Sequence, residues 1–139
     1  MRDLMDKVHL QPAFAPKAAV TDNTAQVSSV CTTTGFDSIM LAFITGTDAD
    51  ADATFVVLIE DSNDNSSYAA VDDAYLNGTE VLASYDFNDD GECRKIGYTG
   101  NKKYVRATVT PANNTGNCFI GGMWVCGNPS RQPTANPPI

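Results

Sequence analysis

SIMLAFIT, at residues 38–45, and TFVVLIE, at residues 54–60, are the two stretches that decide the fold of this chain. Both runs are apolar at even and at odd positions. Successive side chains of a β-strand point to opposite faces of the sheet, so each run predicts a central strand that is covered on both faces. The segment 46–53 between them is polar and rich in Asp, which predicts a connecting loop.

Shorter apolar runs bounded by turn residues continue outward from this pair. The segment 80–87 alternates, with Val81, Ala83 and Tyr85 on one face, and an Asp-Gly turn follows at 88–91. We predict further strands at 26–33, 68–71, 80–87, 93–98, 103–110 and 118–126. About eight strands without a helix longer than a turn or two predict an all-β fold, a two-sheet antiparallel β-sandwich that is jelly-roll-like.

The 139 residues fit one domain with a distinct segment at each end. Residues 1–24 are expected to form an extended N-terminal arm, because Pro12 and Pro16 forbid a continuous helix. Residues 25–127 form the expected β-sandwich domain. Residues 128–139 hold four prolines, which predicts an extended C-terminal tail.

Acidic residues interrupt the first positions and no apolar segment follows them, so no secretory signal is expected. The chain is therefore expected to be made in a cytoplasm, where thiols stay reduced. The four cysteines, at positions 31, 93, 118 and 126, are spaced unlike a zinc site. They are predicted to be unpaired, mostly buried and to act as small apolar residues.

The formal net charge is −8, which repels nucleic-acid phosphates and anionic lipids, so neither partner is expected. No Lys or Arg lies between Val20 and Cys93. The basic residues of the terminal segments and of one late cluster are Arg2, Lys7, Lys17, Arg94, Lys95, Lys102, Lys103, Arg106 and Arg131. One interpretation is chance and solubility; the other is that these residues dock on an acidic partner while the acidic body faces water.

Asp86, Asn88 and Asp90 match the first half of a calcium-binding loop. The twelfth position is Gly97, where such a loop needs a bidentate Glu, and no flanking helix is expected. The competing interpretation is an ordinary β-turn. These three residues are therefore only a weak calcium candidate, and no metal or other cofactor is expected.

His9 is the single histidine, and it lies in the arm, where nothing positions it as a general base. No phosphate-binding loop or nucleophile elbow is present in the sequence. Trp124 alternates in step with Ile120 and Cys126, which favours a place in the core over a sugar-stacking role. The chain is not expected to be an enzyme.

The segment 96–106, IGYTGNKKYVR, resembles a stretch that short β-rich proteins of tailed-phage and prophage virion genes carry late in the chain, G-Y-x-G-x-[KR]-[KR]-[YF]-[VL]-R. Those proteins also tend to show E-[DH]-S-x-D-[NG]-x-x-[YF] after a strongly apolar strand, matched here by EDSNDNSSY at 60–68. They often end in Gly-Asn-Pro, matched at 127–129. The order and spacing of the three motifs carry the resemblance.

This resemblance implies a virion structural protein that decorates or cements the outer surface of a phage capsid. Its partners would be the major capsid protein, at junctions between subunits, and copies of itself in a homotrimer, assembled in the host cytoplasm. The four cysteines and the Pro-rich tail depart from the family pattern, which leaves the oligomer and the docking mode open.

Three alternatives stay open beside it. One is a purely structural interpretation of the segment 96–106, as a hairpin whose Lys102, Lys103 and Arg106 form a charged edge that blocks strand pairing. A second is that the whole chain is a carbohydrate-binding β-sandwich on a virion surface. A third is that it is a head–tail or tail structural protein, which shares the virion but not the location.

Overall fold

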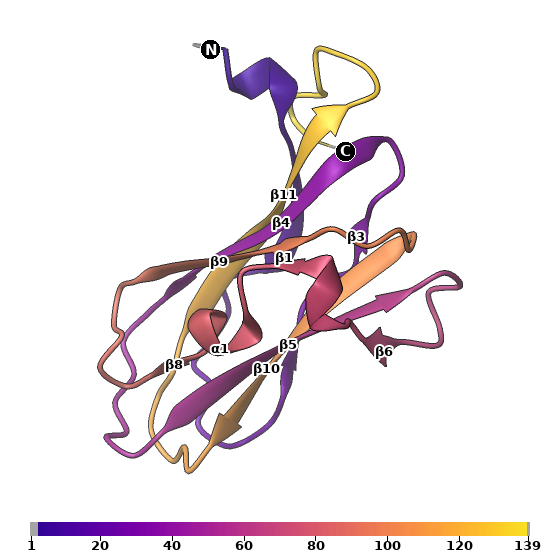
Figure 1. Ribbon diagram of the computed structural model, residues 1–139. Helices are drawn as coiled ribbons and strands as arrows, with labels where there is room; N and C mark the ends of the chain where they lie inside the picture. Colours follow the sequence, from indigo (N-terminus) through magenta and orange to yellow (C-terminus); the bar gives the residue numbers. More distant parts are fainter. Residues whose placement is uncertain (1–2, 139) are drawn as a thin grey trace.

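The computed structural model describes residues 3–138 and shows a sandwich of two antiparallel β-sheets, which confirms the predicted fold class (Figure 1). The long strands are β1 (His9–Phe14), β4 (Phe36–Thr45), β5 (Thr54–Ser62), β9 (Cys93–Tyr98), β10 (Tyr104–Ala112) and β11 (Ile120–Pro129). The short strands are β2 (Gln26–Val27), β3 (Cys31–Thr32), β6 (Ala69–Ala70), β7 (Leu76–Asn77) and β8 (Tyr85–Asp86). Several strands of two residues bring the number within 3–138 to eleven, above the expected eight or so.

Strand pairing divides the sandwich into two sheets. The β4 sheet has the order β1-β11-β4-β9-β7. The β5 sheet has the order β2-β10-β5-β6, with β3 also paired to β10 and β8 to β5. In each sheet one of the two strongly apolar runs occupies a central strand, as their composition predicts. Within residues 3–138, no helix has the length and apolar character needed to cross a bilayer.

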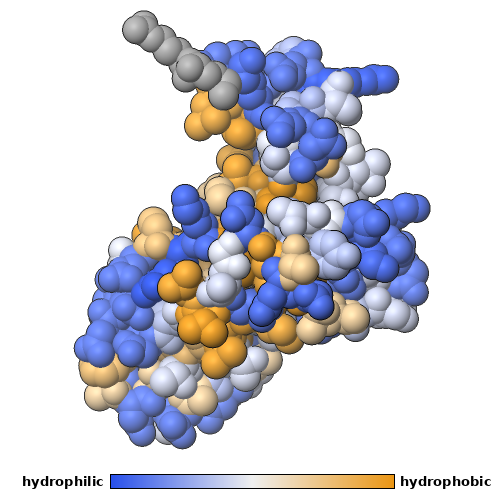
Figure 2. All heavy atoms as spheres, in the orientation of Figure 1, coloured by the Kyte–Doolittle hydropathy of each residue, from blue (hydrophilic) through white to orange (hydrophobic). Residues whose placement is uncertain are grey.

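The predicted strand at 80–87 is wrong in its first half, where the chain forms the helical turn α1 (Glu80–Ala83). Thr79 caps this turn, because its hydroxyl accepts the Leu82 N–H at 3.1 Å. The apparent alternation is satisfied only by Ala83 and Tyr85, which are buried, whereas Val81 is 83% exposed. Figure 2 shows apolar atoms on the surface where Figure 1 draws α1. The remaining helical turns are η1 (Met5–Lys7) and η2 (Asp73–Tyr75).

The α1 turn lies along the free middle of β5 and occupies its backbone donors. The Glu80 carboxylate accepts the Ile59 N–H at 2.6 Å, and the Ser84 hydroxyl accepts the Val57 N–H at 3.0 Å. Strands β6 and β8 pair only with the two ends of β5, at Glu60–Asp61 and Thr54–Phe55. Side chains therefore complete an edge that backbone pairing leaves open.

The segment expected to be an N-terminal arm contributes a strand to the sandwich, because β1 pairs with β11 from His9 to Phe14. The C-terminal segment folds back on it: the Thr134 N–H donates to the Asp6 carbonyl at 3.0 Å, and the Thr134 hydroxyl donates to the Val8 carbonyl at 2.6 Å. The terminal segments thus contact one another within a single chain.

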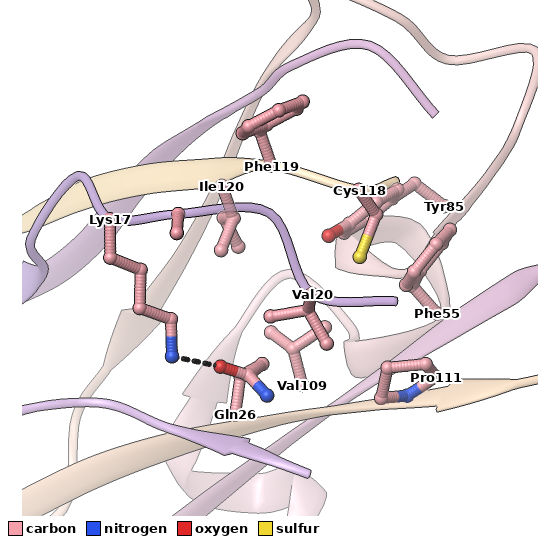
Figure 3. A pocket seen from close by; sticks show the side chains of 11 residues that line it. Lys17, Val20, Gln26, Phe55, Tyr85, Val109, Pro111, Cys118, Phe119 and Ile120 are labelled. Atoms are coloured by element: carbon pink, nitrogen blue, oxygen red, sulfur yellow. Dashed lines mark hydrogen bonds between the residues drawn. The ribbon is translucent and has the colours of Figure 1, made fainter. Parts of the chain in front are cut away.

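Lys17 lies after β1 and hydrogen-bonds the side chain of Gln26 beside a small apolar cavity (Figure 3). The cavity measures about 10 Å³, room for about one water molecule. Most of its walls are apolar side chains, among them Val20, Phe55 and Val109. We assign this cavity a packing role.

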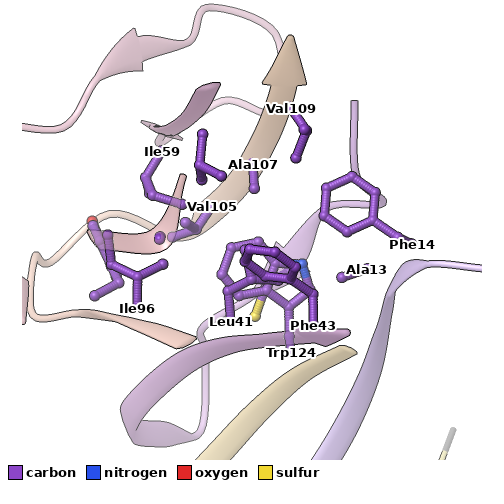
Figure 4. Packing of buried hydrophobic residues seen from close by; sticks show 14 of the residues in the cluster. Ala13, Phe14, Leu41, Phe43, Ile59, Ile96, Val105, Ala107, Val109 and Trp124 are labelled. Atoms are coloured by element: carbon purple, nitrogen blue, oxygen red, sulfur yellow. The ribbon is translucent and has the colours of Figure 1, made fainter. Parts of the chain in front are cut away.

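The core lies between the sheets and is built from the inward positions of the long strands. In Figure 4 Leu41 and Trp124 of the β4 sheet face Ile59 and Val109 of the β5 sheet. Trp124 is 1% exposed, which confirms its predicted place in the core, and its indole N–H donates to the Ser29 carbonyl at 3.1 Å. Burying an aliphatic core side chain such as Leu41 contributes about 1.5–3 kcal/mol to folding.

Candidate docking face on the β4 sheet

The expectation that β4 and β5 are covered on both faces is wrong. Their inward residues are buried, as Leu41 and Val57 show, but nothing within residues 3–138 covers the outward ones. Ile44 of β4 is 49% exposed and Val56 of β5 is 56% exposed. The sandwich has two layers only, so each sheet keeps one face toward solvent, and the two outer faces have different chemistry.

The outer face of the β4 sheet is apolar across four adjacent strands. Strand register places its residues in two rows of Cα partners: Leu10–Val125–Met40–Gly97, and Pro12–Met123–Ala42–Lys95. A third, shorter row consists of Gly121–Ile44–Cys93. We call the residues of these three rows the β4 face. Lys95 is the one charged residue among them.

The exposure of these side chains is substantial. Met123 is 44% exposed and Leu10 is 37% exposed, while Met40, Ala42 and Val125 are partly exposed. Soluble monomers rarely leave large contiguous apolar patches in water, and such patches commonly mark interaction sites. The β4 face therefore stands out in a chain whose net charge is −8.

Phe119 extends the apolar character beyond the end of the sheet. It lies one residue before β11, is 42% exposed, and its carbonyl accepts the Gly46 N–H at 2.9 Å. A Cβ atom on Gly46 would lie 2.6 Å from the Phe119 Cβ, so the close approach requires glycine here.

A shallow groove of about 570 Å³ crosses the β4 face near its β9 side. Met40, Val125 and Lys95 line it, and Gly97 and Gly127 form part of its floor. A Cβ atom on Gly97 would lie 3.0 Å from the Asn77 Cβ. The absence of a side chain at Gly97 therefore leaves room for Asn77 of β7 and makes the groove deeper. The groove is open and has apolar and polar walls, which suits a protruding side chain of a partner.

On the outer face of the β5 sheet, Arg106 interacts with neighbours on the same face. Arg106 forms an ion pair with Glu60 on the neighbouring strand, with 2.9 Å between Nε and Oε2. The guanidinium also lies 4.0 Å from the centre of the Tyr68 ring, a cation–π contact. Thr108 and Thr110 alternate with it along β10. Val27 and Val56 are also exposed on this face, at 54% and 56%, but charged and hydroxyl side chains separate them.

The structure separates the late basic cluster. Lys95 lies on the β4 face, Arg106 lies on the outer face of the β5 sheet, and Lys102 and Lys103 lie in the turn between β9 and β10. Arg94 points the opposite way from Lys95 and pairs with Asp89 at 3.0 Å and with Glu92 at 2.9 Å. A single basic edge from 94 to 106 is therefore not formed.

The basic residues of the terminal segments are also dispersed. Lys7 ends η1, Lys17 bonds Gln26, and Arg131 is exposed in the C-terminal segment. Arg2 lies outside the described residues. Docking through these positions stays a prediction, and Lys95 is the member of the predicted set that shares a surface with the apolar rows.

Two carboxylates of the weak calcium candidate accept backbone hydrogen bonds, one within the turn and one from the loop between β4 and β5. Asp86 accepts the Asn88 N–H at 2.8 Å, and Asp90 accepts the Asp48 N–H at 2.9 Å. Within residues 3–138, no three Asp, Glu, His or Cys side chains are grouped so that they could hold a metal ion. The geometry therefore favours the turn interpretation. His9 is buried and stacks on Phe36, with 5.2 Å between the ring centres.

Asp48 is a buried carboxyl that the sequence did not single out. It is 5% exposed, and neither of its side-chain oxygens has a hydrogen-bond partner among the described residues. Burial, with smaller contributions from Asp90 and Asp89, raises its pKa from 3.8 to about 6. It lies in the loop from β4 to β5, close to the backbone of Phe119.

No protein-family model and no curated protein matches the chain. Among solved structures, it has a likeness to the CBM22-1 and GH10 modules of an endo-1,4-β-D-xylanase 10B from Clostridium thermocellum, solved with xylohexaose. The identity is 11% and the TM-score 0.41, over 95% of this chain and 28% of that one. The chain thus spans little more than a quarter of that protein's length, and so low a TM-score gives no basis for transferring its ligand.

Proposed function

We propose that this chain is a structural, non-catalytic docking module that covers the outer surface of a tailed-phage capsid through its β4 face. The observation that carries the proposal is the apolar surface formed by Leu10, Met40, Ile44, Met123 and Val125. Covering apolar surface contributes about 25 cal/mol for each Å² removed from water, before the costs of association. A partner that covers this face supplies the layer that the sandwich lacks.

The identity of the partner rests on the resemblance of segment 96–106 to virion proteins. Gly97, the second residue of that segment, forms part of the groove floor on the β4 face. The opposite outer face carries the internally paired Arg106 and Glu60 and remains compatible with water. A protein that decorates a capsid needs one face that binds the capsid and one face that remains in solvent. The apolar β4 face and the ion-paired outer face of the β5 sheet would suit these two roles.

The proposal moves the docking surface from the basic residues to apolar ones. Lys95 lies within the β4 face and adds one positive charge to it. Arg94 and Arg106 are neutralised by acidic neighbours and offer a partner little net charge. Attachment at junctions between major capsid subunits, as a homotrimer and after synthesis in the host cytoplasm, remains part of the proposal.

The test compares one substitution on each outer face. Met123→Asp places a charge on the β4 face, and Val56→Asp places the same charge at a similarly exposed position on the β5 sheet. Each variant is added to phage heads that lack the wild-type chain, and occupancy is measured by quantitative mass spectrometry. We expect Met123→Asp to lower occupancy at least tenfold and Val56→Asp to leave it within twofold.

Equal occupancy of both variants would refute docking through the β4 face. Imaging of the decorated particle tests location: density at the tail would favour the head–tail alternative and overturn the capsid assignment. For the carbohydrate-binding alternative, Trp124 offers no stacking platform because it is 1% exposed, which leaves exposed rings such as Tyr75 and Phe119, at 55% and 42%, as the candidates.

A further inference from the structure

Two buried thiols face one another across the interior of the sandwich. Cys31 lies on β3 of the β5 sheet, and Cys126 lies on β11 of the β4 sheet. Their Sγ atoms are 3.8 Å apart, and both residues are 0% exposed. The two positions are 95 residues apart in the chain, so the fold itself brings them together.

Neighbouring contacts hold Cys31 at this position. The Gln11 side chain of β1 forms two hydrogen bonds with the backbone of Thr32, at 2.9 and 3.0 Å. Its amide nitrogen also lies 3.5 Å from Cys126 Sγ. On the other side of Cys31, the Trp124 indole N–H donates to the Ser29 carbonyl at 3.1 Å. The strand that carries Cys31 is thus fastened to the β4 sheet on both sides of the thiol.

We propose that Cys31 and Cys126 are a site of covalent cross-linking, where a disulfide closes between the two sheets. A disulfide requires an Sγ–Sγ bond of about 2.05 Å, so each sulfur has to move by about 1 Å, within reach of small side-chain rotations. The other two cysteines lie elsewhere in the fold: Cys93 is exposed on the β4 face, and Cys118 is buried near the Asn114 amide.

The oxidant is a small-molecule disulfide such as oxidised glutathione. One cysteine thiolate attacks a sulfur of that disulfide, forms a mixed disulfide and releases one small thiol. The second cysteine then attacks the protein sulfur of the mixed disulfide, forms the Cys31–Cys126 bond and releases the second small thiol. The two cysteine protons end on the two released thiols, and the protein loses two hydrogen atoms.

Burial decides when the bond forms. The hydrogen bond between the two thiols raises the pKa of Cys31 and lowers the pKa of Cys126. Both residues are 0% exposed, so a small-molecule disulfide cannot reach either sulfur in the closed sandwich. Exchange therefore proceeds while the chain folds or when the sheets open. Once formed, the bond is shielded from reductants by the same burial.

The experiment refolds the Cys93→Ser protein in a buffer of reduced and oxidised glutathione, then quenches and alkylates it in denaturant. Intact mass gives the number of free thiols, three before closure and one after it. A peptide map identifies the pair as 31–126. Cys31→Ala is expected to keep both of its remaining thiols, and the matched buried control Cys118→Ala to lose both.

Closure is also expected to raise Tm by about 5–15 °C, because the cross-link restricts the unfolded chain over a long loop. Three free thiols after equilibration, a map that joins Cys118 to either partner, or a closed form with a lower Tm would each overturn the proposal. The peptide map of the Cys93→Ser protein decides the pairing even if Cys31→Ala fails to fold. These results are independent of docking through the β4 face.

Discussion

The two outer faces of the sandwich are centred on strands with nearly identical apolar sequences, yet the residues exposed on the two faces differ in chemistry. Both β4 and β5 are apolar at every position of their central segments, yet their neighbours differ. β10 places Arg106, Thr108 and Thr110 beside β5, whereas β11 places Gly121, Met123 and Val125 beside β4. A strand's own composition therefore does not determine the character of its face; the strands that flank it do.

The largest expected change in stability comes from adding a side chain at Gly122, on the inward side of the β4 sheet. A Cβ atom on Gly122 would lie 2.6 Å from the Phe43 Cβ and 2.9 Å from the Ala42 carbonyl oxygen. Gly122→Val is expected to lower the free energy of unfolding by about 3 kcal/mol or more in urea titrations, because packed strands must shift. The adjacent Gly121→Ala is the control: its Cβ would lie 3.9 Å from the nearest contact, and we expect little change.

The next largest change in stability is expected from Asp48→Asn, in the loop that connects β4 to β5. The pKa of Asp48 is raised, so the folded protein holds this proton more tightly than the unfolded chain between pH 3.8 and about 6. Stability from this group therefore falls as pH rises through that window, and the ionised carboxylate destabilises the fold above it. We expect Asp48→Asn to raise the free energy of unfolding at pH 7 by about 2 kcal/mol.

The measurement is denaturant unfolding at several pH values for wild type and variant, with the exposed Asp37→Asn as control. The difference between Asp48→Asn and wild type is expected to grow from pH 4 to pH 7. A constant difference across this range would contradict the assigned pKa shift.

The charge balance of the β5 sheet is tested by Arg106→Ala. This change removes an ion pair with Glu60 and a contact with the Tyr68 ring, both partly exposed. We expect a loss of about 1 kcal/mol in thermal or urea unfolding, and less at high salt. Lys95→Ala on the β4 face is the matched control, for which we expect no measurable loss.

The smallest effect on stability is expected on the β4 face itself. Ile44→Thr replaces a half-exposed apolar side chain and keeps the β-branched shape that suits a strand. We expect the free energy of unfolding to change by about 0.5 kcal/mol or less, with higher solubility measured by precipitation with ammonium sulfate. A loss as large as that of Gly122→Val would mean that the face is part of the core.

Alternation of apolar and polar residues predicted the long strand at 103–110 well. Val105, Ala107 and Val109 occupy alternate positions of that predicted strand, and all three are buried. It failed at Glu80–Ala83, because a four-residue helix held by the Thr79 cap and by bonds to β5 leaves no helical period to detect. Of the short strands, β2, β3, β6 and β8 lie within predicted strands, whereas β7 was not predicted. The longer β1 was also missed, because its segment was assigned to the arm.

The candidate site was less accessible to sequence reasoning. The outward-pointing residues of 38–45 are apolar in the sequence and were predicted to be buried. An apolar run alone cannot show whether one or both faces of its strand are covered. The basic residues near 94–106 are close in sequence, yet β9 and β10 belong to different sheets and separate them. The Cys31–Cys126 contact joins positions too distant for any spacing rule.

The hydrogen bonds from Glu80 and Ser84 to the middle of β5 have a consequence for crowded copies of this chain. An added strand needs free N–H groups to begin fibre growth, and those of Val57 and Ile59 are already occupied by side chains. On the crowded surface that the proposed function requires, a neighbouring copy would therefore find no free N–H group in the middle of β5 to pair with. The α1 turn would in this way oppose strand pairing between adjacent copies along this side.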